Sequence, residues 1–179
     1  PAVEDVMKDG PYAVVTLHRP SNVDDREKLI EIMAALAELS QDMPVIFPVH
    51  PRTSRNIEEF GLTGLVRKSS LHLTAPLSYM PFLRVWKDAA LVMTDSGGLQ
   101  EETTALGVPC FTIRENTERP VTIEEGTNIL VGTEGAKILE AFKRFRAGDV
   151  KKGRVPELWD GKAADRIIEI LVASNRYSS

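Results

Sequence analysis

The stretch TDSGGLQEETTALGVPC, residues 94–110, decides how the rest of this sequence is interpreted. It continues the apolar run ALVMTD (90–95), which predicts a buried strand, into a helix that Gly107 is expected to end. Two adjacent glycines, Gly97 and Gly98, stand where this helix begins. Because a glycine inside a helix costs about 1 kcal/mol relative to alanine, the pair needs a physical reason.

The same strand–helix unit recurs along the chain. Short apolar runs predict strands, and the segments between them carry apolar residues at helical spacing, such as Met80, Leu83 and Trp86 on one helix face. The expected strands are 12–18, 45–50, 71–75, 90–95, 108–113 and 128–132, and the expected helices are 24–39, 52–62, 77–89, 97–106, 134–147 and 163–173. This alternation predicts an α/β fold with a parallel sheet covered by helices on both faces.

Composition places the 179 residues among folded globular domains, with 42% hydrophobic and 27% charged residues. The net charge of -4 argues against nucleic acid or a membrane surface as partner, and no apolar run is long enough to span a membrane. One cysteine, Cys110, allows no internal disulfide, which is typical of the cytoplasm. The start PAVEDVMKDG shows neither a secretory signal nor an initiating methionine, so we expect a cytoplasmic protein that is trimmed or cut from a longer one.

Polar groups follow four of the expected strands. These groups are His18 and Arg19, then His50 and Arg52, then Ser96 with the glycine pair, then Arg114 and Arg119. Carboxyl ends of parallel strands meet at one edge of a sheet, where ligands of such folds bind. Basic groups beside the helix that begins near Gly97 therefore predict an anion site.

The glycine pair has two interpretations. A phosphate could approach the bare N–H groups at the helix start, with the Ser96 hydroxyl as a further ligand or N-cap. Alternatively, the turn could need positive φ angles. We favour the phosphate because one glycine usually suffices for a turn. Neither GxGxxG nor GxxxxGK[ST] is present.

Other candidates also keep a structural alternative. Glu102, about one and a half helical turns beyond Gly97, could accept from two ribose hydroxyls or remain a solvated acid, and spacing does not decide between them. Arg119 could clamp a phosphate, although its local context favours a surface salt bridge. Phe82 could belong to the core or stack on a base.

The histidines favour function at two positions and structure at the third. His18 and His50 each end an expected strand just before a proline or an Arg-Pro pair, which favours a functional role, whereas His72 lies inside a strand. No histidine or cysteine pair has metal-ligand spacing, so we expect neither a metal nor a cofactor.

Several stretches in order resemble the C-terminal half of the non-hydrolysing UDP-N-acetylglucosamine 2-epimerases. They are TLHRPSNVDD, PVHPRT, LTAPLSYMPFL, TDSGGLQEE, ALGVPCFTIRENTERPVTIEEGTN and DGKAADRIIEIL, and together they cover nearly the whole chain. One departure is Ser21, where the family's commonest form has glutamate, and it affects the loop near a regulatory UDP-sugar site of bacterial members.

The resemblance implies the glycosyltransferase B architecture, in which two Rossmann-like domains enclose a cleft. Residues 1–179 would form the single UDP-binding Rossmann-like domain at the C-terminal side, with 148–161 as a loop before the final helix. The N-terminal domain would be absent. The implied partners are UDP, UDP-N-acetylhexosamine, that missing domain and, in the full-length enzyme, a second copy of the chain.

The resemblance also assigns roles to the candidate residues. The implied diphosphate ligands are Ser96, Gly97 and Gly98, and the implied ribose ligand is Glu102. Phe82 would flank the uracil beside Pro76–Leu77. His18 would assist catalysis. The implied remaining substrate contacts, around the sugar and the regulatory site, are Arg19, His50, Thr117 and Arg119.

The family reaction eliminates UDP to a glycal and adds it back after inversion at C2. The carboxylates expected to move the C2 proton belong to the N-terminal domain, so this chain alone is expected to bind UDP and to be inactive. Two alternatives stay open: the nucleotide domain of a glycosyltransferase B type transferase, and a single-domain binding subunit that recruits a catalytic partner.

Overall fold

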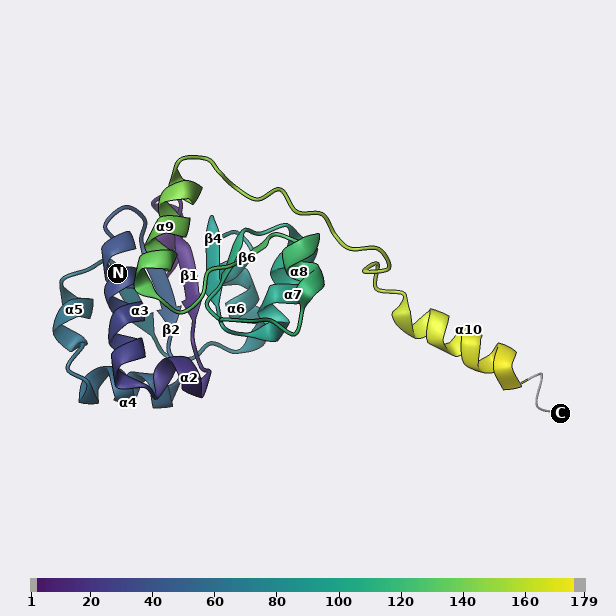
Figure 1. The fold of residues 1–179 in the computed structure, drawn as a ribbon, viewed down its shortest axis with the longest axis horizontal. Helices are drawn as coiled ribbons and strands as arrows, with labels where there is room; N and C mark the ends of the chain where they lie inside the picture. The colour runs from purple at the N-terminus through teal and green to yellow at the C-terminus, as the bar shows by residue number, and fades with distance from the viewer. Residues whose placement is uncertain (1–2, 176–179) are drawn as a thin grey trace.

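The computed structural model describes residues 3–175 as an α/β domain followed by a separate helix (Figure 1). Six parallel strands form one sheet in the order β3-β2-β1-β4-β5-β6, which confirms the predicted fold class. The strands are β1 (Ala13–Thr16), β2 (Val45–Pro48), β3 (Leu71–Thr74), β4 (Leu91–Thr94), β5 (Cys110–Thr112) and β6 (Asn128–Leu130). The strand order reverses between β1 and β4, and crevices for ligands form at such switch points.

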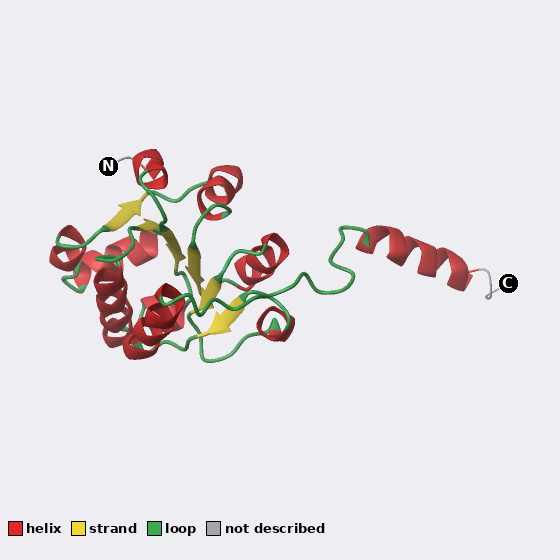
Figure 2. Cartoon of the chain, turned by 90° about the horizontal axis from the view of Figure 1, so that it is seen from above, coloured by secondary structure: helices red, strands yellow, loops and turns green. Residues whose placement is uncertain are grey.

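Helices cover both faces of this sheet (Figure 2). The face that packs on the larger core cluster carries α3 (Arg26–Leu39), α4 (Pro51–Glu59), α5 (Thr63–Arg67) and α9 (Gly135–Arg146). The opposite face carries α1 (Val3–Lys8), α6 (Tyr79–Trp86) and α7 (Gly97–Leu106). Short helices α2 (Pro20–Val23) and α8 (Pro120–Glu124) lie in the loops after β1 and β5, and α10 (Ala163–Asn175) follows the last loop.

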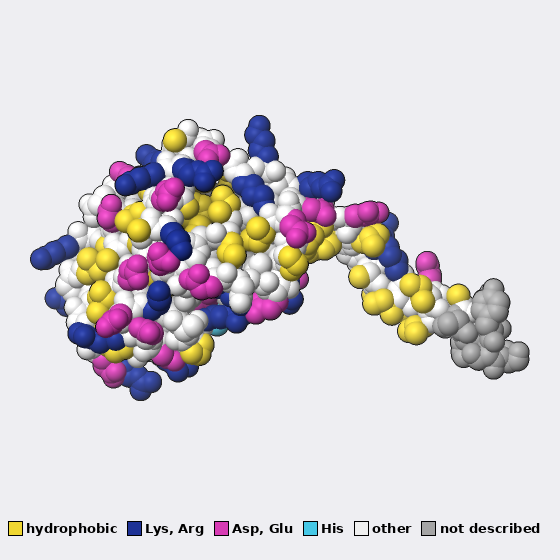
Figure 3. All heavy atoms as spheres, in the orientation of Figure 1, with side chains coloured by type: hydrophobic (Ala, Val, Ile, Leu, Met, Phe, Trp, Pro, Cys, Tyr) yellow, Lys and Arg dark blue, Asp and Glu magenta, His cyan; other side chains and the backbone are white. Residues whose placement is uncertain are grey.

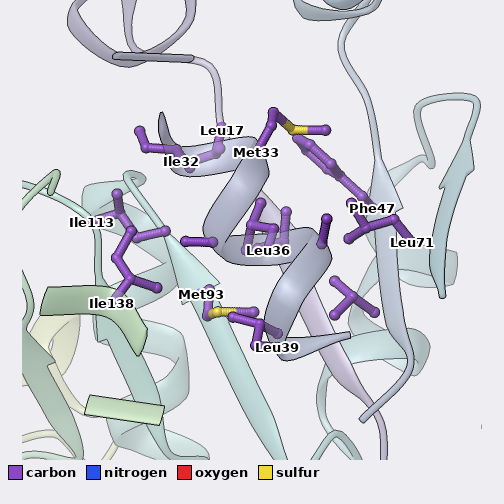
Figure 4. Close-up of a cluster of buried hydrophobic side chains, with 14 of the residues drawn as sticks. Leu17, Ile32, Met33, Leu36, Leu39, Phe47, Leu71, Met93, Ile113 and Ile138 are labelled. Carbon is purple, nitrogen blue, oxygen red and sulfur yellow. The ribbon is translucent and has the colours of Figure 1, made fainter. Parts of the chain in front are cut away.

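Alternation along the strands explains why both faces are buried. Val15 of β1 packs into the cluster under α3, whereas its neighbour Val14 packs into the cluster with Trp86. Figure 4 shows the first cluster, in which Leu36 and Leu39 of α3 lie against strand side chains such as Met93. Helical spacing of apolar residues on one stripe and period-two burial on the strands therefore produce two apolar clusters, one on each face of the sheet.

The expected elements all form, with strands shorter by one or more residues. The helices α1, α2, α5 and α8 were not expected, because each spans at most 6 residues and offers too few turns for a periodic pattern. The expected apolar stripe of α6 is wrong at Met80, a residue that is 67% exposed. Met80 lies in the first turn of α6, beside an open groove that Val3 and Met7 of α1 also line.

The segment 147–162 contains no helix or strand and leads to α10, which extends away from the sheet (Figure 1). Gly153 of this segment crosses against the backbone of Gly126, and the N–H of Arg154 donates to the carbonyl of Glu125 at 2.8 Å. The segment is therefore anchored over the α8–β6 turn. Within the described residues, no helix is both long and apolar enough to cross a membrane.

Candidate functional site

The start of α7 has the geometry expected for an anion site. Ser96 is the N-cap, and its hydroxyl accepts from the N–H of Leu99 at 3.5 Å. Gly97 and Gly98 are the first two helical residues, and neither has a positive φ, so the positive-φ interpretation of the pair is wrong. A methyl group built on either glycine meets no atom closer than 4.0 Å. The backbone therefore does not require glycine here, and the pair leaves open space in front of N–H groups without helical partners.

His18 at the end of β1 is held by Asp95 at the end of β4. The His18 Nδ1 atom lies 2.9 Å from Oδ1 of Asp95, whose side chain is fully buried, while the His18 side chain is 50% exposed. The hydrogen bond to Asp95 raises the pKa of His18, against an opposing effect of burial. A carboxylate that is buried beside an exposed imidazole favours a charged, oriented ring.

A cavity of ≈ 220 Å³ joins several predicted site residues at the carboxyl ends of β1, β2 and β3. His18, His50 and Phe82 line it, together with the Pro76–Leu77 loop. Phe82 is half-buried on α6 and packs at the edge of the core cluster. His50 has a structural task as well, because its Nδ1 accepts from the N–H of Arg52 at 3.3 Å and caps α4.

The loop after β5 is tied to α7 by two contacts. The Thr117 hydroxyl donates to Oε1 of buried Gln100 at 2.6 Å, and Arg119 Nε lies 2.8 Å from Oε1 of Glu101. Both predicted residues of this loop therefore lie beside the helix that begins with the glycine pair. The ion pair agrees with the surface salt bridge that the local sequence favours for Arg119. Glu102 follows on α7 and is half-buried.

The basic groups of this edge are paired, contrary to a simple positive cluster. Arg114 is 8% exposed and its Nη2 donates to Oε1 of Glu118 at 2.7 Å, which lowers the pKa of Glu118 to about 2. Arg19 Nη2 lies 3.6 Å from the same carboxylate. An anion that binds Arg19 or Arg119 must therefore compete with a carboxylate, whereas the N–H groups at the start of α7 meet no such competitor.

The predicted residues thus form neighbouring groups at one sheet edge. Arg19 lines a separate cavity of ≈ 460 Å³ with Lys28 and Arg114, and a further cavity of ≈ 630 Å³ is the apolar groove between α1 and α6. The sequence analysis missed Asp95 and Gln100, which are fully buried. The sequence could have indicated Asp95, because an acidic residue directly after a buried strand and just before a glycine pair is not explained by apolar packing.

Residues 1–172 match the family model described as UDP-N-acetylglucosamine 2-epimerase. Among curated relatives, the UDP-N-acetylglucosamine 2-epimerase of Methanocaldococcus jannaschii is 40% identical over 169 residues, which are 93% of this chain and 46% of the relative. The chain therefore spans about half the length of the curated relatives it matches.

Solved structures agree with this relationship. The crystal structure of the Methanocaldococcus jannaschii UDP-GlcNAc 2-epimerase in complex with UDP-GlcNAc and UDP has a TM-score of 0.80 and 36% identity, over 96% of this chain and 51% of that chain. An Escherichia coli heptosyltransferase solved with ADP has a TM-score of 0.50 and 19% identity, over 82% of this chain and 46% of that chain, a likeness of fold alone.

Proposed function

Because the chain belongs to the UDP-N-acetylglucosamine 2-epimerase family, we propose that it is the UDP-holding half of an enzyme that interconverts UDP-GlcNAc and UDP-ManNAc. The reaction would proceed by elimination of UDP and its re-addition. In this proposal residues 1–179 are the C-terminal Rossmann-like domain of a two-domain, glycosyltransferase B type enzyme that acts in the cytoplasm as a homodimer.

The start of α7 is the observation that carries the proposal. Gly97 and Gly98 present N–H groups across open space at the switch point of a parallel sheet, where a diphosphate can approach closely. Glu102 is two residues into the next helical turn, where it can accept from ribose hydroxyls. Phe82, in the cavity it shares with His18, can flank the uracil.

These groups suit the departure of an anionic leaving group. As the bond between the sugar and UDP breaks, negative charge grows on the diphosphate, and fixed N–H donors stabilise that charge. A protonated His18 can add a donor beside the diphosphate, and Arg119 with Thr117 can add donors on the sugar side, with Arg19 and His50 around them. The base that moves the C2 proton is proposed to lie in the remaining half of the enzyme.

The apolar face of α10 supports a missing half. Ile167, Ile168 and Ile170 are 57%, 59% and 66% exposed, and Figure 3 shows apolar side chains along this helix uncovered. Large apolar surfaces of this kind usually pack on a neighbour. We propose that the other half of the enzyme covers this face.

Calorimetry and an epimerisation assay test the proposal. The chain should bind UDP more tightly than UMP, and UMP more tightly than uridine. It should not convert UDP-GlcNAc on its own. Equal affinity for UDP and uridine would contradict the proposed diphosphate site. Turnover by the chain alone would refute the need for a second half. The alternative, a transferase domain, predicts transfer to an acceptor without C2 epimerisation once the other half is supplied.

A further inference from the structure

We propose that Asp95 is the positioning residue for His18: its carboxylate fixes the imidazole so that Nε2 is the nitrogen that meets the ligand. The orientation follows from the geometry alone. Only the identity of that ligand, a diphosphate, rests on the proposed function.

Asp95 cannot turn away from His18, because its other hydrogen bonds hold it. Its side chain is fully buried, and Oδ2 accepts from the N–H of Arg19 at 2.9 Å and from Nδ2 of Asn22 at 3.1 Å. The backbone N–H of His18 is shared between Oδ1 at 3.2 Å and Oδ2 at 3.1 Å. Oδ1 also accepts from Nδ1 of His18 at 2.9 Å. Three donors of the loop after β1 besides the imidazole therefore hold the carboxylate that follows β4, with Oδ1 turned toward the His18 ring.

This arrangement fixes which nitrogen carries the proton. An ionised carboxylate only accepts hydrogen bonds, so Nδ1 of His18 must carry a hydrogen in both charge states. Neutral His18 then presents a bare Nε2, and protonated His18 presents an Nε2–H donor. The charged or titratable groups around the ring are Asp95, Arg19 and, across the shared cavity, His50.

His50 provides an internal reference with the opposite arrangement. Its Nδ1 accepts from the backbone N–H of Arg52, so neutral His50 must carry its proton on Nε2. Both histidines end strands and line one cavity, yet their hydrogen bonds demand opposite tautomers. A general effect of the cavity on imidazoles would give both the same tautomer, whereas positioning by Asp95 acts on His18 alone.

Nitrogen-15 NMR of the histidine side chains tests the proposal on this chain without ligand. Above the imidazole titration, His18 should be the Nδ1–H tautomer and His50 the Nε2–H tautomer. In Asp95→Asn, the side-chain oxygen keeps the bonds to Arg19 and Asn22, so the amide NH₂ faces Nδ1 of His18. The variant should therefore switch His18 to Nε2–H and lower its pKa, with His50 and His72 unchanged. An Nε2–H tautomer of His18 in the wild type, or no change in a folded variant, would overturn the proposal.

The ligand part has a separate readout in UDP affinity against pH. Wild-type affinity should fall about tenfold as His18 loses its proton, the effect of one charged hydrogen bond, and Asp95→Asn should move this inflection to lower pH. A pH-independent UDP affinity would contradict the diphosphate as ligand of Nε2. Absence of any UDP binding would refute the proposed function, while the NMR result would still decide the role of Asp95. Should the variant fail to fold, the wild-type tautomer decides.

Discussion

Arg119 and Glu101 form an ion pair, with 2.8 Å between Nε and Oε1, that joins the loop after β5 to the first turns of α7. Both side chains are more than 40% exposed, 44% and 41%, so the pair is weak and can be exchanged for a ligand. Glu102, the next residue, is proposed to hold the ribose. Glu101 therefore competes with the ligand for Arg119, whereas Glu102 is proposed to bind the ligand.

Substitution of the two glutamates should move UDP-GlcNAc affinity in opposite directions. Glu101→Gln should raise affinity up to a few-fold, because Arg119 then no longer has to break an ion pair before it contacts the ligand. Glu102→Gln should lower affinity, by about 5- to 150-fold for the loss of about 1–3 kcal/mol from a charged hydrogen bond. Calorimetry measures both, and equal changes in the two variants would contradict this assignment.

The free energy of unfolding should depend on pH through the ionisation of His18. Its pKa is raised from 6.5 in the folded state, so its contribution to the free energy of unfolding is complete below about pH 6.5 and is lost as pH rises through the folded pKa. The difference between wild type and His18→Gln in urea unfolding should therefore shrink with rising pH. His72, whose pKa is lowered by burial, should show the reverse, with destabilisation as pH falls. A difference for His18 that grows with pH would contradict the ion pair with Asp95.

Substitution of two isoleucines should have different effects on stability, because one lies in the core and the other on the uncovered helix α10. Ile138 of α9 is 0% exposed, so Ile138→Ala should cost about 2–5 kcal/mol of stability. Ile170 of α10 is 66% exposed, so Ile170→Ala should change stability by no more than about 0.5 kcal/mol. Chemical denaturation measures both. A cost at Ile170 near that at Ile138 would show that α10 packs on the rest of this chain.

Position 153 should not accept a side chain, because Gly153 crosses against the backbone of Gly126. A methyl group built on Gly153 would lie 2.5 Å from the carbonyl oxygen of Gly126, so Gly153→Ala should destabilise the anchored segment by about 1–3 kcal/mol. Gly64→Ala in α5, where a methyl group meets nothing within 4 Å, is the matched control. Equal stabilities of the two variants would place the 147–162 segment away from the α8–β6 turn.

Elements with several turns or a full apolar run could be predicted from sequence, because their periodicity is visible. The helix Gly97–Leu106 was predicted at both ends, since Ser96 caps it and Gly107 ends it in the left-handed conformation, with φ 72°. Met80 was misplaced because helical spacing cannot show where a groove leaves one turn uncovered. The short helices α2 and α8 have no period to detect.

Contacts between distant segments could not be predicted in the same way. His18 follows β1, Thr117 follows β5, and Asp95 and Gln100 both belong to the β4–α7 unit. Only the strand order brings His18 to Asp95 and Thr117 to Gln100. Arg114 and Glu118 are only four residues apart, but they lie in a loop without a helical period, so their pairing could not be predicted either.

UDP calorimetry of Gly98→Ala decides whether the open space at the start of α7 holds a diphosphate. A methyl group at this position meets only Ser96 Oγ, at 4.0 Å, and points toward the helix start, where the phosphates would lie. The variant should be as stable as wild type, or up to about 1 kcal/mol more stable, and its UDP affinity should be at least about tenfold lower. Gly64→Ala should leave affinity unchanged. Wild-type UDP affinity in a stable Gly98→Ala chain would show that the diphosphate does not bind in this space.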